Sequence, residues 1–213
     1  MPLTDPLALR RASALVAMIG VVLYVLIDVV LQLLPPHYSP ISEAESNLAV
    51  GPYGWVMNLN FLGRAVFCVA IVVAVHLTGL PSRRKTAGLV LLLVGGVSSA
   101  VLAFFPTDVG IAVSSTLQTQ TPVGQVHLIA ATTGFIAALL ALLLLTSWLH
   151  GCDVLRHSRG WATLFVGLGI AGVLGIVASA TVLPGYLGLV ERVCLLGILG
   201  WVFAVGDGIR RLR

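Results

Sequence analysis

Long apolar runs alternate with short polar segments along the whole chain. Six of these runs reach the roughly 20 residues that a helix needs to cross a bilayer, and they cover residues 12–34, 55–80, 86–105, 123–149, 161–183 and 187–209. None of them alternates with a period of two, and open sheet edges cannot be satisfied in lipid. The pattern therefore predicts an all-α membrane bundle of six transmembrane helices, forming a single domain over residues 1–213.

Composition narrows the class further. Hydrophobic residues make up 58% of the chain and charged residues only 9%, with a mean hydropathy of +1.05. A soluble domain carries about 25% charged residues, so a water-soluble enzyme, a disordered chain and a secreted disulfide scaffold are all excluded. The three cysteines, at positions 68, 152 and 194, place no pair in an outward connection, and no structural disulfide is expected.

The basic residues predict the orientation. Ten of the 12 lysines and arginines lie in the N-terminal segment, the second and fourth connections and the C-terminal segment, and the connections at 35–54, 106–122 and 184–186 contain none. Because positive charge stays on the cytoplasmic side, we expect both termini in the cytoplasm and a multi-pass protein of the cell membrane. We interpret the net charge of +4 as an orientation signal, and we expect the basic side chains to contact anionic lipid head groups as well. We expect no nucleic-acid partner.

Four charged residues lie within the outer halves of the spans instead. Asp28, Arg64, Glu191 and Arg192 all fall in the predicted outer half. Embedded charges are expensive and are usually paired inside the bundle. Two interpretations stay open: Asp28 pairs with Arg64 or Arg192 and locks the first span in place, or the four residues line a polar pocket that binds a small amphiphilic ligand.

The outward connections add candidate rim residues. Ser42 and Glu45 have the spacing of a capping box, which predicts a short interfacial helix over 43–50. Asp108 lies in the second outward connection, and His127 lies about four residues into the fourth span. We expect Asp108 and His127 to form the rim of the ligand-binding pocket, with Ser42 in the segment above it.

Metal and cofactor sites are weakly supported. His37, Asp108 and His127 could together offer two imidazoles and a carboxylate, but no pair of histidines at helical spacing and no HExxH motif accompanies them. His76 and His150 lie too near the water interface to hold a haem. We therefore predict no metal site and no cofactor.

Small residues recur at every fourth position on four spans and predict close helix packing. The faces are Gly95, Ser99 and Ala103; Ala130, Gly134 and Ala138; Gly167, Ala171, Gly175 and Ser179; and Gly200, Ala204 and Gly208. Packing within one bundle is the main interpretation, and a homo- or hetero-oligomer through these faces is the alternative. A weak repeat of spans two and three in spans four and five also stays open.

Three sets of short motifs resemble a known family. They are Tyr38-Ser-Pro-Ile-Ser through Gly51-Pro-Tyr-Gly-Trp55 to Gly63, then Phe105-Pro-Thr-Asp108 followed by His127, and finally Gly188-Leu-Val-Glu-Arg192. Over residues 12 to 209 the chain resembles the six-span membrane family catalogued as domain of unknown function 998. The resemblance implies the fold and a membrane location but no established reaction. It puts Ser42, Asp108, His127, Glu191 and Arg192 at family-like positions.

Three functional hypotheses follow. The leading one is a membrane protein whose outer polar pocket binds, or helps move, a small amphiphile or lipid. The second is a membrane-embedded lipid hydrolase that uses His127 as base with Asp108 or Glu191 as partner. The third is a structural subunit of a larger membrane assembly, held by the small-residue faces.

Overall fold

The computed structural model describes residues 5–109, 119–183 and 185–212 and confirms the all-α class. It is 78% helical, and its described part contains six helices long and apolar enough to cross a membrane. They are α1 (Pro6–Gln32), α2 (Gly54–His76), α3 (Arg83–Leu102), α4 (Pro122–His150), α5 (Arg159–Ser179) and α6 (Leu187–Arg210), with short 3-10 helices η1 (Glu45–Ala49) and η2 (Asp153–Ser158). The chain is therefore a multi-pass membrane protein.

Local chemistry moves two helix ends away from the apolar boundaries. Helix α1 starts earlier than its apolar run, because the side chain of Asp5 accepts a hydrogen bond from the Leu7 amide at 3.0 Å and Pro6 suits the first helical position. Helix α2 stops at His76, short of the predicted residue 80. Gly79 then adopts a positive φ of 62°, a turn conformation that glycine accepts without steric cost.

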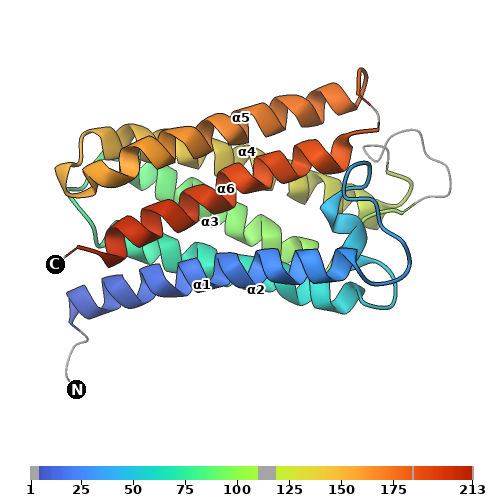
Figure 1. The fold of residues 1–213 in the computed structure, drawn as a ribbon, viewed down its shortest axis with the longest axis horizontal. Helices are drawn as coiled ribbons and strands as arrows, with labels where there is room; N and C mark the ends of the chain where they lie inside the picture. Colours follow the sequence, from blue (N-terminus) through green and yellow to red (C-terminus); the bar gives the residue numbers. More distant parts are fainter. Residues whose placement is uncertain (1–4, 110–118, 184, 213) are drawn as a thin grey trace.

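The helices form a closed ring in chain order (Figure 1). Each helix packs against the next, and α6 returns to pack against α1. Both termini lie at one end of the bundle, here called the terminal end, and the connection between α1 and α2 lies at the opposite, loop end. An even number of spans requires this arrangement. That the terminal end faces the cytoplasm stays a prediction from the basic residues.

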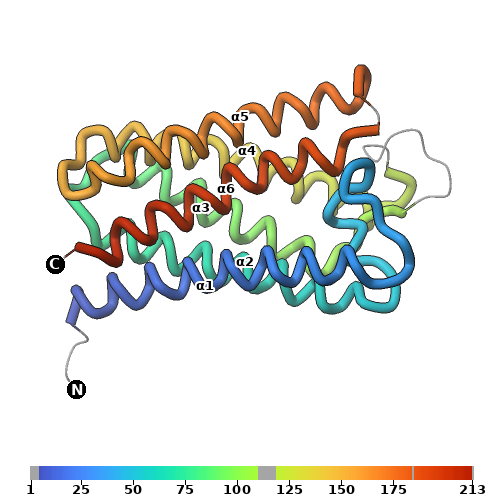
Figure 2. Tube along the Cα trace, in the orientation of Figure 1, coloured from blue at the N-terminus to red at the C-terminus, as the bar shows by residue number. Residues whose placement is uncertain are grey.

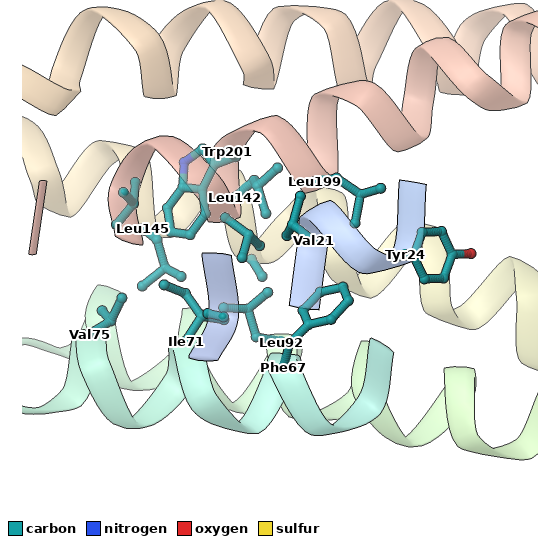
Figure 3. Close-up of a cluster of buried hydrophobic side chains, with 14 of the residues drawn as sticks. Val21, Tyr24, Phe67, Ile71, Val75, Leu92, Leu142, Leu145, Leu199 and Trp201 are labelled. Carbon is teal, nitrogen blue, oxygen red and sulfur yellow. The ribbon is translucent and has the colours of Figure 1, made fainter. Parts of the chain in front are cut away.

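The centre of the bundle is an apolar cluster toward the terminal end (Figure 3). Ile71, Leu142, Leu145 and Trp201 are buried there, and the indole Nε1 of Trp201 donates to the Thr146 hydroxyl at 2.8 Å, which satisfies its one polar atom. Tyr24 borders the cluster with its hydroxyl pointing away from it. A polar network begins at the Tyr24 hydroxyl and continues toward the loop end.

Small residues let neighbouring helices approach closely. A Cβ atom at Gly175 would meet Val190, one at Gly200 would meet Phe165, and one at Gly134 would meet Ser98. These contacts join α5 to α6 and α3 to α4, so part of the small-residue pattern serves packing within the bundle. An oligomer through the remaining small residues stays a prediction.

The connection between α1 and α2 bends over the loop end and reaches the start of α6 (Figure 2). We call residues 38–49 the strap. The Leu189 amide donates to the Ile41 carbonyl at 3.0 Å, and a Cβ atom at Gly188 would collide with the carbonyl oxygens of Pro40 and Glu43. Glycine is therefore needed where α6 begins beneath the strap, because only it allows so close an approach.

Candidate functional site

The predicted charged residues converge beneath the strap. Asp28 comes from α1, Arg64 from α2, and Glu191 and Arg192 from α6. Of the two pairings that the sequence left open, Asp28 takes Arg192, with 3.6 Å between Oδ1 and Nη2. The other carboxylate oxygen of Asp28 accepts from Gln32 Nε2 at 2.6 Å. This ion pair joins the first helix to the last.

Arg64 has a different acidic partner, Glu45, which the sequence pattern had suggested as part of a capping box. Its Nη1 lies 3.9 Å from Oε2 of Glu45 and donates to the Tyr24 hydroxyl at 3.0 Å, and its Nε donates to Ser99 Oγ at 2.7 Å. The Tyr24 hydroxyl in turn donates to Glu45 at 2.8 Å. The network therefore links α1, α2, α3 and the strap.

The capping interpretation of Ser42 and Glu45 is wrong. The short helix is a 3-10 turn over Glu45–Ala49 that starts after Ala44 without a side-chain cap. Ser42 is exposed, whereas the Glu45 residue is only 3% exposed. Burial raises the pKa of the Glu45 carboxyl to about 8, against the opposing effect of the Arg64 guanidinium. A sequence signal existed: Glu45 shares the helical face of the buried Leu48 and Ala49.

Arg192 also ties the strap to α6. Its guanidinium donates to the Tyr38 hydroxyl at 2.9 Å and to the Pro40 carbonyl at 3.1 Å. The Tyr38 hydroxyl lies 2.8 Å from the Glu43 carbonyl oxygen, and burial raises the pKa of this phenol well above its usual range. Arg192 thus contacts both the Asp28 carboxylate within the bundle and the backbone of the strap.

A long groove begins at the Asp28–Arg192 pair. It has a volume of about 1110 Å³ and runs between α1 and α5 over the surface of α6. Its polar end near the strap is formed by Asp28, Gln32, Glu45 and Arg192, its middle is apolar, and its far end lies at Asp207. The Oδ1 atom of Asp28 and the Nε atom of Arg192 are buried and have no hydrogen-bond partner among the described residues.

A smaller pocket of about 200 Å³ lies on the other side of the strap, between α4, α5 and α6. His127, Asp108 and Glu191 all line it. His127 is 4% exposed, and its Nδ1 lies 2.6 Å from the Phe105 carbonyl oxygen. Its Nε2 atom is buried and has no hydrogen-bond partner in the described parts of the chain.

The two carboxylates at this pocket have other partners. Asp108 accepts from the Thr121 hydroxyl at 2.7 Å and from the backbone amides of Gln120 and Thr121 at 2.7 and 3.0 Å. These hydrogen bonds, led by the one from the Thr121 hydroxyl, lower the pKa of Asp108. Glu191 Oε2 accepts from the Glu45 amide at 2.7 Å. Neither carboxylate hydrogen-bonds to His127 in the described structure.

The three candidate metal ligands, His37, Asp108 and His127, do not line one common pocket. His37 lines a separate pocket near Pro35 and Tyr38, apart from the one that His127 and Asp108 share. Within residues 5–109, 119–183 and 185–212, no group of three histidine, cysteine, aspartate or glutamate side chains could hold a metal ion.

Comparison with known proteins gives one match. The model of a family described as "Protein of unknown function (DUF998)" matches residues 18–206. No curated protein and no solved structure matches the chain. The match covers the strap and helices α2 to α5 in full, together with parts of α1 and α6. The chain therefore belongs to the DUF998 family of membrane proteins.

Proposed function

We propose that the protein binds an amphiphile or lipid, with the polar head at the Asp28–Arg192 pair and the tail in the groove. The observation that carries this proposal is the ion pair itself: it stands at the loop end of an open groove, and each partner keeps one buried polar atom without a hydrogen bond. Buried polar atoms normally find a partner. A bound head group would supply one.

The rest of the groove suits a hydrocarbon chain. Val25 and Val29 line it from α1, and Leu196 and Phe203 line it from α6. The groove volume of about 1110 Å³ lies just above the range of about 300–1,000 Å³ that is usual for small-molecule sites. This apolar stretch lies between charged groups at both ends of the groove, Asp28 and Arg192 near the strap and Asp207 and Arg211 at the terminal end. It matches the hydrocarbon tail of an amphiphile whose head lies at the strap.

The guanidinium of Arg192 favours a head group that carries an anionic oxygen. The planar guanidinium of Arg192 is suited to phosphate or carboxylate, and Asp28 beside it can accept from an amine or hydroxyl on the same head. With the loop end outside the cell, as the basic residues predict, the head would lie in the outer leaflet.

Mass spectrometry of the protein released from detergent tests this function. We expect the wild type to retain native lipid and Arg192→Gln to lose most of it. Arg83→Gln is the matched control, because this exposed arginine lies at the terminal end and does not line the groove. Equal lipid retention in both variants would contradict the proposal.

The lipid-hydrolase hypothesis keeps one supporting observation, the unpartnered Nε2 of His127. A general base needs such a lone pair. Its expected helpers, Asp108 and Glu191, form their hydrogen bonds with other groups. Accumulation of an intact ester in His127→Gln that the wild type releases as cleaved product would favour catalysis over binding.

A further inference from the structure

The pocket around His127 differs in charge from the groove. The described residues that line it include two acids, Asp108 and Glu191, and one histidine, but no lysine or arginine. The nearby arginines serve other partners: Arg64 contacts Glu45, and Arg192 contacts Asp28. A ligand that suits this pocket must therefore differ from the anionic head proposed for the groove.

The tautomer of His127 determines whether its free ring nitrogen acts as a hydrogen-bond donor or acceptor. A carbonyl oxygen can only accept, so the 2.6 Å contact with Phe105 requires the proton on Nδ1. In the neutral ring the Nε2 atom then carries a lone pair. This atom is buried at a residue that is 4% exposed, and leaving such an acceptor unpaired is costly. The pocket thus presents an acceptor that calls for a hydrogen-bond donor.

Glu191 adds a negative charge without a cationic partner. No lysine, arginine or histidine nitrogen lies within 4.0 Å of its carboxylate among the described residues, whereas its neighbour Arg192 pairs with Asp28. Successive residues point about 100° apart on a helix, so Glu191 and Arg192 face different pockets. One oxygen of Glu191 is used by the Glu45 amide, which leaves the other for a ligand.

The walls and size of the pocket restrict the ligand further. Leu128 and Ile136 from α4 and Val173 from α5 make most of the pocket apolar. A volume of about 200 Å³ has room for six or seven groups of about the size of a water molecule. A short alkyl chain fits this space, and a complete lipid does not.

We propose that this pocket binds the ammonium group of a small alkyl amine. The ammonium donates to Nε2 of His127 and to the free oxygen of Glu191, and the alkyl chain lies against Leu128, Ile136 and Val173. The three donors of a primary ammonium can serve both acceptors of this pocket, and its charge compensates the buried carboxylate. This site is independent of the groove, which requires Arg192.

The test compares three probes of equal chain length: hexylamine, 1-hexanol and hexanoate. Each is titrated against the full-length protein in detergent, and the shift in unfolding temperature gives an apparent affinity. We expect a saturable stabilisation by hexylamine, weaker stabilisation by hexanol and none by hexanoate. Equal stabilisation by amine and alcohol, or preference for hexanoate, would overturn the proposal.

Two conservative variants locate the site. His127→Asn keeps a donor at the position of Nδ1 but removes Nε2, and Glu191→Gln keeps the acceptor for the Glu45 amide but removes the charge. Each should weaken hexylamine binding about tenfold or more, because each removes a charge-assisted hydrogen bond. His150→Asn, at the exposed terminal end of α4, should leave it unchanged. Unaltered affinity in both pocket variants would refute the assignment.

A second measurement does not depend on the folding of variants. In wild-type protein with ¹⁵N-labelled histidine, hexylamine should shift the Nε2 resonance of His127 and leave that of His150 in place. A saturable effect of hexylamine on unfolding without a shift at His127 would place the amine elsewhere and contradict the proposal.

Discussion

Asp28 on the first helix and Arg192 on the last are joined by an ion pair, with 3.6 Å between Oδ1 and Nη2. The pair closes the ring of helices near the loop end, where α1 meets α6. The same arginine holds the strap through Tyr38 and Pro40. Closure of the bundle, position of the strap and the polar end of the groove therefore all depend on one guanidinium.

Stability should respond unequally to losing one or both partners. The side chains of Asp28 and Arg192 are 13% and 20% exposed, and breaking a buried pair by removing one charge costs on the order of 3 kcal/mol. We expect Asp28→Asn to lower the unfolding temperature in detergent more than Asp28→Asn combined with Arg192→Gln. A double variant that is the less stable of the two would mean that the charges act independently.

Glu45 should make stability depend on pH. Its folded pKa of about 8 lies above the usual value of about 4.3, so the fold favours the neutral acid. Stability is then highest below about pH 4.3 and falls as the pH rises toward 8, with a slope of at most about 1.4 kcal/mol per pH unit. We expect Glu45→Gln to flatten this slope in thermal unfolding measured from pH 5 to 8. An unchanged slope would show that Glu45 ionises freely in the fold.

The orientation can be checked by cysteine labelling in intact cells. Ser42 in the strap and His157 in η2 are both exposed and lie at opposite ends of the bundle. With the basic residues in the cytoplasm, a membrane-impermeant maleimide should label Ser42→Cys directly and His157→Cys only after permeabilisation. The reverse pattern would invert the topology. Ser158, although next to His157, is buried and is unsuited as a reporter.

The apolar runs were sufficient to predict the six helices, because each span must satisfy its own backbone in lipid. The shared depth of the embedded charges also predicted that Asp28 pairs with an arginine. The depth of each residue along its span could not show whether Asp28 pairs with Arg64 or with Arg192. That choice depends on how α2 and α6 are rotated about their axes. Nor could it reveal that Arg64 turns to Glu45 instead.

Glu45 was missed for a related reason. It lies in a connection, where a glutamate is normally solvated, and its side chain enters the bundle only because the strap folds back over α6. The strap takes that path through contacts 146 residues apart in the chain, such as that of Glu45 with Glu191. The separation of the groove from the His127 pocket likewise depends on where the strap lies.

The most direct test of the proposed function is to map where a lipid tail lies. The protein is reconstituted in nanodiscs with a phosphatidylcholine that carries a photoactivatable group in its acyl chain, and the cross-linked residues are mapped by mass spectrometry. Val29 and Leu196 line the groove, while Val66 and Val69 on α2 are exposed apolar residues outside it.

The proposal predicts that adducts concentrate at Val29 and Leu196 in the wild type. In Arg192→Gln the ratio of groove adducts to those at Val66 and Val69 should fall about tenfold, because the head group loses its charge-assisted contact. Adducts that follow exposure alone, with the same ratio in both proteins, would contradict binding in the groove.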